Sequence, residues 1–315
     1  RLIEYLHRIQ DDVGCLPARL LTALAERLRL TTAEVFEVAS FYHHFDIVKE
    51  GDPAPPRLTV RVCDSLSCSM AGAGALLERL PAILGDEVRV QRVPCVGRCA
   101  QAPVAVVGTR PVEGADAGKV LAAVESGDHD DIPPADSLDL AAYRAAGGYR
   151  LLRHLVDEGD AAHPRVIDEL THAGLRGLGG AGFPLGRKWD IVGRQPAPRL
   201  LAVNIDEGEP GTFKDRHYLE RNPHQFLEGM LIAARVVGIE RIYIYLRDEY
   251  AGVRALLQRE LASLQADPPC PLPAIELRRG AGSYVCGEES AMIESIEGRR
   301  GMPRLRPPYI AEVWL

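Results

Sequence analysis

Four of the seven cysteines occur in two pairs whose spacing suits a metal centre. Cys63 and Cys68 have four residues between them, and Cys95 and Cys99 have three. Each pair follows a stretch that alternates like a β-strand, so the four thiolates can converge on one site. Four thiolates hold a [2Fe–2S] cluster, whereas structural zinc usually binds cysteines two residues apart, although wider spacing is compatible with it. The residues alone favour an iron–sulfur cluster and leave zinc or a disulfide open.

The remaining cysteines, Cys15, Cys270 and Cys286, stand alone and are expected to be small buried hydrophobic residues. An odd number of cysteines, with no recognisable secretory leader, does not indicate a disulfide framework. We therefore expect a reducing, cytoplasmic compartment.

A glycine-rich run over residues 177–186 could bring bare backbone close to a ligand. It contains the spacing G-x-G-x-x-G at Gly177, Gly179 and Gly182. A dinucleotide-binding turn must follow a strand, and here a helix is expected before the run, so the Rossmann interpretation is weak. Glycine backbone can instead approach a phosphate or a flat ring, and basic residues flank the run: Arg176, Arg187 and Lys188. The alternative is a tight glycine turn in a packed domain.

An acidic run over residues 204–215 follows residues 200–203, which are predicted to form a buried strand. In α/β sheets ligands bind at the carboxyl ends of strands, where this run lies. Its carboxylates could accept hydrogen bonds from ribose or ribityl hydroxyls, or could bind Mg²⁺ or Ca²⁺. The glycine loops on either side favour sugar hydroxyls, and a solvated acidic loop is the remaining alternative.

The last motif, residues 280–289, combines glycines with Tyr284, Glu288 and Glu289 after a predicted strand at 275–277. A tyrosine beside glycine-rich backbone would suit contacts to an aromatic ring and its polar edges. Carboxylates at a helix N-terminus are stabilising in any protein, so the interpretation depends on the position of the loop at the same sheet edge.

The rest of the sequence supplies the elements that must position these motifs. Residues 1–50 show helical periodicity with a capping box at Thr31–Glu34, and the proline-rich stretch 51–56 interrupts it. Strands are then expected at 58–62, 88–90 and 103–107, with a helix over about 70–80. Farther on, strands at 200–203, 241–246 and 275–277 alternate with helices over about 223–237 and 249–264, which indicates a parallel sheet.

The composition is that of a globular protein, with 46% hydrophobic and 26% charged residues and a net charge of -7. No basic block is present to neutralise phosphates, so nucleic-acid binding is not expected. No apolar stretch approaches about 18 residues, so no membrane span is expected.

Three long segments together resemble the flavoprotein subunit of respiratory complex I and its relatives. These segments are residues 176–189, 204–215 and 280–290. Residues 1–127 resemble the complex I subunit that has a helical bundle and a thioredoxin-like [2Fe–2S] domain. The residues that carry this second resemblance are Gln10, Gly14, Phe41, Tyr42 and the cysteine pairs.

The fusion of these two units is typical of the β subunit of NAD-dependent formate dehydrogenases and of the diaphorase subunit of NAD-reducing hydrogenases. Residues 45–51 and 244–250 look most like the formate dehydrogenase version. The resemblance therefore implies a molybdenum- or tungsten-containing formate dehydrogenase α subunit as catalytic partner. A hydrogenase diaphorase and a complex I flavoprotein subunit are the alternatives. An alternative from a different functional class is a non-catalytic scaffold that keeps the motifs without binding cofactors.

The resemblance implies a role for individual residues. FMN would contact Gly177, Gly179, Gly180, Lys188, Asn204, Asp206, Glu207, Tyr284, Gly287 and Glu288. NAD(H) would lie near Phe183, Glu209 and Glu289, and the [2Fe–2S] cluster would be bound by Cys63, Cys68, Cys95 and Cys99. The implied reaction is reversible hydride transfer between C4 of NAD(H) and N5 of FMN, followed by single-electron exchange with iron–sulfur clusters. The cofactors carry this chemistry, so no catalytic acid or base is expected from the protein.

The implied architecture is α/β and multidomain. We expect a helical bundle (1–50), a thioredoxin-like [2Fe–2S] domain (51–127), a linker (128–160) and a Rossmann-like α/β domain that binds FMN and NADH (161–315). The family continues to a cysteine motif that holds a [4Fe–4S] cluster. We expect that part to be missing here, because the sequence stops at Leu315, where the family would continue towards the motif. The final residues 311–315 also depart from the usual continuation.

Overall fold

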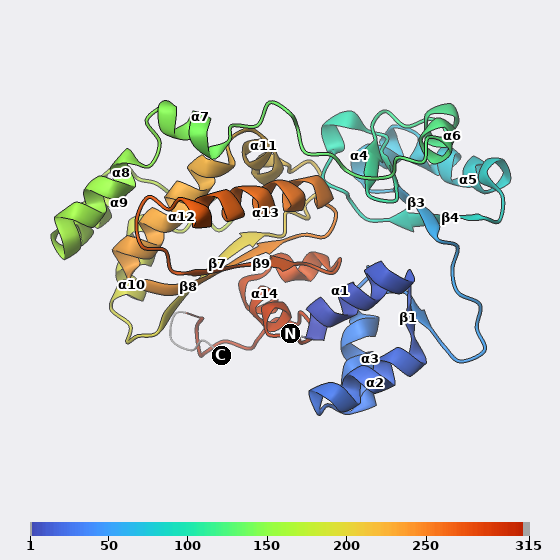
Figure 1. Ribbon diagram of the computed structural model, residues 1–315, viewed down its shortest axis with the longest axis horizontal. Helices are drawn as coiled ribbons and strands as arrows, with labels where there is room; N and C mark the ends of the chain where they lie inside the picture. The colour runs from blue at the N-terminus through green and yellow to red at the C-terminus, as the bar shows by residue number, and fades with distance from the viewer. Residues whose placement is uncertain (1, 311–315) are drawn as a thin grey trace.

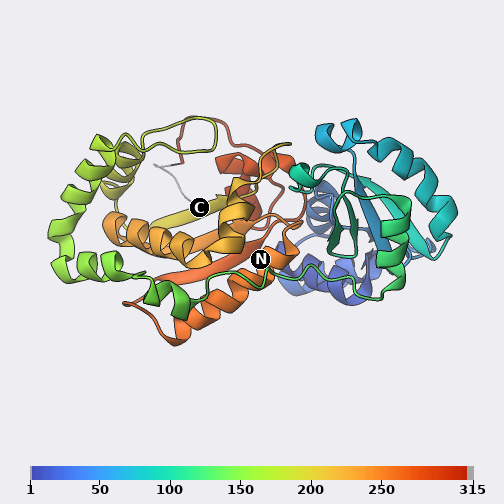
Figure 2. The same ribbon diagram turned by 90° about the horizontal axis from the view of Figure 1, so that it is seen from above.

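The computed structural model describes residues 2–310, so the predicted departure at 311–315 lies outside the described residues. The chain folds into a helical bundle, a small α/β unit that carries the paired cysteines, and a larger α/β unit (Figure 1). Seen from above, the bundle and the small unit lie on the same side of the larger unit (Figure 2). The expected α/β class is confirmed.

The N-terminal bundle contains α1 (Leu2–Val13), α2 (Ala18–Leu28) and α3 (Thr32–Phe41), with two short parallel strands, β1 (Leu16–Pro17) and β2 (Ile47–Val48). The predicted capping box is confirmed. The backbone N–H of Glu34 donates to the Thr31 hydroxyl at 3.2 Å, and the backbone N–H of Thr31 donates to the Glu34 carboxylate at 2.7 Å. Two backbone donors are thereby satisfied, which defines where α3 begins.

The small unit is built on a four-stranded sheet in the order β4-β3-β5-β6. Its elements are β3 (Leu58–Cys63), α4 (Leu66–Met70), α5 (Ala73–Leu84), β4 (Val88–Val93), a 3-10 turn (Cys99–Gln101), β5 (Ala105–Val107), β6 (Arg110–Val112) and α6 (Ala117–Glu125). The three predicted strands are confirmed. β6 adds an antiparallel hairpin to β5, and a strand of three residues is too short to show a hydrophobic period.

The larger unit has the predicted parallel sheet, in the order β7-β8-β9. Its elements are α10 (Leu185–Gly193), β7 (Arg199–Ile205), α11 (Lys214–Arg221), α12 (Pro223–Val237), β8 (Ile239–Leu246), α13 (Ala251–Ala266), β9 (Ala274–Arg279), a 3-10 turn (Tyr284–Gly287) and α14 (Glu289–Ile296). Because all three strands run the same way, the segments that follow them leave the sheet at one edge. These segments include the acidic run after β7 and the glycine loop after β9.

The predicted linker, residues 128–160, has no helix or strand up to Asp139, and then forms helices. These are α7 (Leu140–Ala145) and α8 (Arg150–Glu158), followed by a 3-10 turn (Gly159–Ala161) and α9 (Ala162–His172). Tyr149 and Leu152 are fully buried in the core of the larger unit. The carboxylate of Glu228 in α12 accepts hydrogen bonds from the backbone N–H of both. The second half of this segment is therefore packed structure, a result of tertiary burial that its composition does not reveal.

The bundle shares its hydrophobic core with the larger unit. Leu6, Leu16 and Tyr42 of the bundle belong to the same buried cluster as Tyr245 of β8 and Cys286 in the turn before α14. The small unit has a separate core between its sheet and helices. Thus the bundle packs against a segment more than two hundred residues away in sequence, and the order of units along the chain does not give their order in space.

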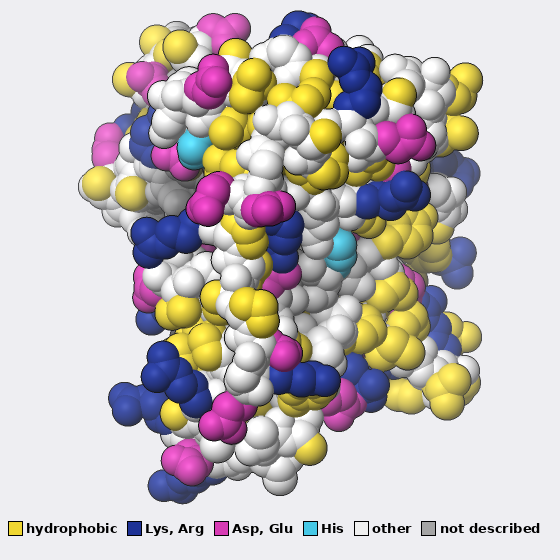
Figure 3. All heavy atoms as spheres, turned by 90° about the vertical axis from the view of Figure 1, so that its right-hand side faces the viewer, with side chains coloured by type: hydrophobic (Ala, Val, Ile, Leu, Met, Phe, Trp, Pro, Cys, Tyr) yellow, Lys and Arg dark blue, Asp and Glu magenta, His cyan; other side chains and the backbone are white. Residues whose placement is uncertain are grey.

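The surface formed by the small unit and the bundle carries interspersed basic and acidic side chains (Figure 3). Among the described residues, none of the helices combines the length and the apolar character needed to cross a membrane.

Candidate functional site

The two cysteine pairs converge in the small unit. Cys63 ends β3, Cys68 lies in α4, and Cys95 and Cys99 lie on the loop that follows β4. The Sγ atoms of Cys95 and Cys99 are 3.3 Å apart, and the thiol of Cys63 contacts both Cys68 and Cys95. All seven cysteines of the chain are free thiols, so no disulfide competes for them.

The four cysteines are the ligand set that a [2Fe–2S] cluster needs, which is four thiolates spread over two metal atoms. The hydrogen bond with Cys95 lowers the pKa of Cys63 against the opposing effect of burial, whereas the same contact and burial raise the pKa of Cys95.

The second cysteine loop touches the acidic run of the larger unit. The backbone N–H of Gly211 donates to Sγ of Cys99 at 3.1 Å. Nε of Arg216, at the start of α11, donates to the carbonyl oxygen of Gly97 at 3.3 Å. A cluster bound by the cysteines would therefore lie directly against the loop that is expected to bind FMN and NAD(H).

Arg247, the first residue after β8, bridges the same two segments. Its side chain is buried, and its two terminal nitrogens donate to the carbonyl oxygens of Glu207 and Cys95. Its Nε donates to the carboxylate of Glu249 at 3.0 Å. The guanidinium is a planar fork of donors, so one side chain fixes the cysteine loop and the acidic run relative to each other.

Gly97 allows the two units to approach this closely. Its φ is +74°, and a Cβ atom at this position would lie 2.3 Å from the hydroxyl oxygen of Tyr250. The Tyr250 hydroxyl in turn donates to the carboxylate of Glu207 at 3.0 Å. Both the backbone conformation and the space exclude any larger residue at position 97.

The acidic run and the second glycine loop meet at the edge of the sheet. Nδ2 of Asn204 donates to the carbonyl oxygen of Gly287 at 2.8 Å. A Cβ atom on Gly287 would lie 3.4 Å from the carbonyl oxygen of Asp206, and one on Gly208 would lie 3.0 Å from the ring of Tyr284. The ring of Tyr284 is largely exposed beside this backbone. The structure thus brings two of the three predicted segments into direct contact.

Asp206 is the residue in this contact that fits a polyol ligand. Its Oδ2 atom is shielded from solvent and has no hydrogen-bond partner in the described structure. Burial raises the pKa of Asp206 to about 7, with Arg247 acting in the opposite direction. A buried acceptor without a donor is costly unless something supplies the hydrogen bond, and the hydroxyls of a ribityl chain would do so. These residues therefore fit FMN.

The carboxylates of two other predicted FMN residues accept hydrogen bonds from the protein's own backbone. Glu207 accepts from the backbone N–H of Asp215 at 2.9 Å, at the start of α11. Glu288 caps α14 by accepting from the backbone N–H of Ser290 and Ala291, both at 2.9 Å. These side chains shape the loops, and any contact with FMN would come from the backbone beside them.

The first glycine run forms a separate exposed loop, which closes on itself. The backbone N–H of Gly177 donates to the carbonyl oxygen of Phe183 at 3.0 Å, and the Arg176 side chain donates to the carbonyl oxygen of Gly182 at 2.9 Å. α9 precedes the run, as expected, so it is not a βαβ turn. A Cβ atom on Gly179 or Gly180 would have no atom within 4 Å. The glycine backbone there is open to a ligand.

The remaining predicted contacts lie at the surface around these loops. Phe183, Lys188, Glu209 and Glu289 are exposed. Glu289 pairs with Arg306 at 2.8 Å, and the guanidinium of Arg187 lies 5.7 Å from the centre of the Phe183 ring.

Sequence reasoning misses Arg247, Tyr250 and Gly97. A signal exists for Arg247, because a lone arginine directly after a buried central strand lies where the acidic run leaves the sheet. Gly97 and Tyr250 have no such signal, since their roles come from a contact between two separately folded units.

Two family profiles match the chain. Residues 1–127 match the family described as thioredoxin-like [2Fe–2S] ferredoxin, and residues 170–315 match the Nuo51 FMN-binding domain. The expected [2Fe–2S] and FMN-binding units are thereby confirmed. The expected [4Fe–4S] cluster has no counterpart in these matches.

Similar proteins are subunits of NAD-linked oxidoreductases. The mitochondrial NADH-ubiquinone oxidoreductase 51 kDa subunit of Neurospora crassa is 41% identical over 56% of this chain and 38% of its own length. The NAD-reducing hydrogenase HoxS subunit alpha of Cupriavidus necator is 32% identical over 98% of this chain and 57% of its own length. A crystal structure of NAD⁺-reducing [NiFe]-hydrogenase in the H₂-reduced state superposes with a TM-score of 0.79 at 32% identity, covering 98% of this chain and 56% of that chain. The chain thus spans between 38% and 57% of the length of these relatives.

The contacts of Arg247 generate a prediction about the cluster. Reduction adds negative charge to the cluster, and a nearby cation stabilises it, so Arg247→Met should lower the [2Fe–2S] midpoint potential by an amount on the order of tens of millivolts. Arg247→Lys keeps the charge and should recover most of that shift. The measurement is a redox titration followed by EPR. Equal potentials in the wild type and both variants would show that Arg247 does not influence the cluster.

Proposed function

Because the chain joins a thioredoxin-like [2Fe–2S] ferredoxin unit to a Nuo51 FMN-binding unit, we propose that it is the NADH-facing electron-transfer subunit of a larger oxidoreductase. The observation that carries this proposal is the direct contact between the cysteine loop and the acidic run through Gly211 and Arg247. Electron transfer needs the two redox groups to be close and fixed, and this contact supports such an arrangement. A scaffold without cofactors would have no use for the buried acceptor of Asp206.

The residues of the chain bind and orient cofactors and supply no acid or base. When bound, FMN supplies hydride exchange with NAD(H) and single-electron exchange with iron–sulfur clusters. Asp206 would accept hydrogen bonds from the ribityl hydroxyls, and the open backbone at Gly179 and Gly180 would approach the FMN, with Lys188 providing positive charge. Glu209, Glu289 and Phe183 are proposed to lie on the NAD(H) side. The seven free thiols fit a reducing compartment, so a cytoplasmic location belongs to this proposal.

The finer proposal is the β subunit of a NAD-dependent formate dehydrogenase, with a molybdenum- or tungsten-containing α subunit as partner. It rests on the resemblance of residues 45–51 and 244–250. These two segments lie at one interface, where Asp248 pairs with His44, the residue next to the first segment. A NAD-reducing hydrogenase diaphorase is the second candidate, because the HoxS relative matches 98% of this chain.

Isolation of the chain with its natural partner subunits distinguishes these candidates. NAD⁺ reduction by the isolated complex is measured with formate and, separately, with hydrogen. We expect NAD⁺ reduction with formate as electron donor and none with hydrogen. Activity with hydrogen and none with formate would replace the formate dehydrogenase proposal by the hydrogenase one, and the absence of NADH oxidation with an artificial acceptor would contradict the coarser proposal.

Gly179→Val should abolish FMN binding while the protein still folds. The valine side chain has open space in the protein, since no atom lies within 4 Å of a Cβ there, but it would occupy the volume assigned to the cofactor. Gly186→Val is a contrasting variant, because its Cβ would lie 2.3 Å from the Thr171 hydroxyl oxygen and should destabilise the fold itself. Flavin absorbance and thermal unfolding separate the two effects. A Gly179→Val protein that retains stoichiometric FMN would refute the assignment of this loop.

The affinity for FMN should fall as the pH drops below about 7. Burial raises the pKa of Asp206 to about 7, and hydroxyl donors from FMN would favour its ionised form. Binding therefore releases a proton below that pH, and the affinity decreases by up to about tenfold per pH unit. Asp206→Asn should remove this dependence.

Riboflavin, which lacks the phosphate that titrates near pH 6, is the control ligand for this experiment. The measurement is flavin fluorescence quenching between pH 5 and 8. If riboflavin shows the same pH profile with Asp206→Asn as with the wild type, Asp206 does not accept hydrogen bonds from the flavin side chain.

A further inference from the structure

The first part of the second glycine loop is hydrogen-bonded by the helical bundle. Three successive carbonyl oxygens, those of Gly280, Ala281 and Gly282, each accept a hydrogen bond of 3.0 Å from the bundle. The donors are Nε2 of His7 and the backbone N–H groups of His44 and His43, respectively. These residues come just before Tyr284 and Gly287, which are proposed to contact FMN. The start of the flavin loop is thus held by a unit that lies outside the sheet.

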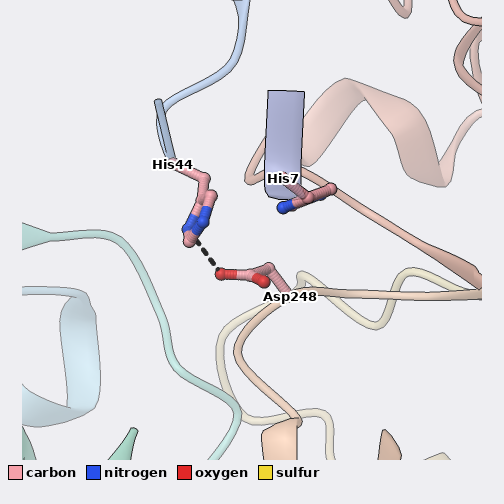
Figure 4. A group of neighbouring side chains, drawn as sticks. All are labelled: His7, His44 and Asp248. Atoms are coloured by element: carbon pink, nitrogen blue, oxygen red, sulfur yellow. Dashed lines mark ion pairs between the residues drawn. The ribbon is translucent and has the colours of Figure 1, made fainter. Parts of the chain in front are cut away.

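The hydrogen bonds fix the protonation of both histidine side chains. A carbonyl oxygen only accepts, so His7 must carry its proton on Nε2, and its Nδ1 is buried without a hydrogen-bond partner in the described structure. Nδ1 of His44 lies 2.7 Å from the carboxylate of Asp248, while its Nε2 lies 3.4 Å from a guanidinium nitrogen of Arg279. Arginine only donates, so His44 carries its proton on Nδ1. Figure 4 shows His7 and His44 beside Asp248.

Asp248 connects His44 to the residue that precedes the loop. Its carboxylate accepts from Nε of Arg279, the last residue of β9, at 2.5 Å. Nη1 of Arg254, in α13, lies 3.5 Å from the same carboxylate. The side chain of His44 therefore acts on Arg279 directly and through Asp248, and Arg279 leads straight into Gly280.

A divalent cation does not suit this cluster, although two histidines and a carboxylate could in principle bind one. Two guanidinium groups already approach Asp248, and a metal ion among them would add further positive charge to a buried site. Burial, followed by the charge of Arg279, lowers the pKa of His7, in agreement with a neutral ring that donates from Nε2. The cluster is best described as a hydrogen-bonded connection between two units.

The hydrophobic contacts support the same connection. Tyr42 of the bundle donates from its hydroxyl to the carbonyl oxygen of Arg299 at 2.6 Å. Ala281 and Cys286, on either side of Tyr284, are buried in the core that the bundle shares with the larger unit. The bundle therefore contacts the glycine loop at residues 280–282 and at Cys286.

We propose that the helical bundle positions the flavin loop, with His7 holding the backbone at Gly280 and His44 holding Arg279 through Asp248. This inference rests on the proposed function and adds to it a role for a unit that carries no cofactor. His7 and His44 are positioning residues, because they act on FMN only through residues 280–287. Without their side chains, the loop loses the contacts at Gly280 and Arg279, so the positions of Tyr284 and Gly287 are less restrained.

The test compares each histidine with a variant that keeps its donor. His7→Ala and His44→Ala should each raise the dissociation constant for FMN by about three- to tenfold, as expected for a lost hydrogen bond. In His7→Gln the amide replaces the Nε2 donor, and in His44→Asn it replaces the Nδ1 donor, so both should bind FMN within about twofold of the wild type. The matched control is His43→Ala: this side chain is exposed, and the backbone donor to Gly282 remains. The [2Fe–2S] EPR signal should be unchanged in all five variants, which shows that the small unit has folded, and thermal unfolding checks the rest of the protein.

A second readout does not depend on FMN. Hydrogen–deuterium exchange of the peptide covering residues 280–288 should be faster in His7→Ala and His44→Ala than in the wild type, and unchanged in His43→Ala. Equal exchange and equal FMN affinity in all variants, with a wild type that binds FMN, would overturn the inference alone. A wild type that binds no FMN would overturn the proposed function. A stoichiometric divalent metal that is lost in His44→Ala would show a metal site in place of the proposed connection.

Discussion

The buried guanidinium of Arg247 donates to the carbonyl oxygens of Cys95 and Glu207, and it is the central contact between the cysteine loop and the acidic run. The interaction is buried, so water cannot replace either hydrogen bond without cost. Neighbouring residues support the same contact between the cysteine loop and the acidic run. Gly97 leaves room for Tyr250, Gly211 donates to the sulfur of Cys99, and Glu207 is held by Tyr250 and by the first turn of α11.

This constraint explains why the acidic run is only partly available to ligands. A solvated acidic loop would have all its carboxylates free, but here the Glu207 carboxylate is used to start α11 and to receive Tyr250. Asp206, one residue earlier, keeps a buried oxygen without a hydrogen-bond partner in the described structure. Glu207 thus holds the loop and the start of α11 in place, and the free oxygen of Asp206 remains for the cofactor.

The bundle contributes to the flavin side of the structure, even though its sequence belongs with the cysteine unit in the family match to residues 1–127. Its core continues into β8 and the second glycine loop. A small three-helix bundle buries little apolar surface by itself, and sharing a core with a larger neighbour stabilises both. The hydrogen bonds from His7, His43 and His44 to three consecutive carbonyl groups also determine the register of the loop against the bundle.

The local elements and the chemistry of the motifs could be predicted from the amino-acid sequence. Hydrophobic periodicity predicted the strands that lead to Cys63 and the acidic run, and the capping residues Thr31 and Glu34 marked the start of a helix. These features depend on neighbours along the chain, and so they can be read from it. Three other features emerge only from the folded chain: residues 140–158 are packed helices, Arg247 joins two backbones, and His7 and His44 reach Gly280 and Asp248. Those contacts join residues far apart in sequence, and their energy comes from burial and from donors brought together by packing, which no local pattern specifies.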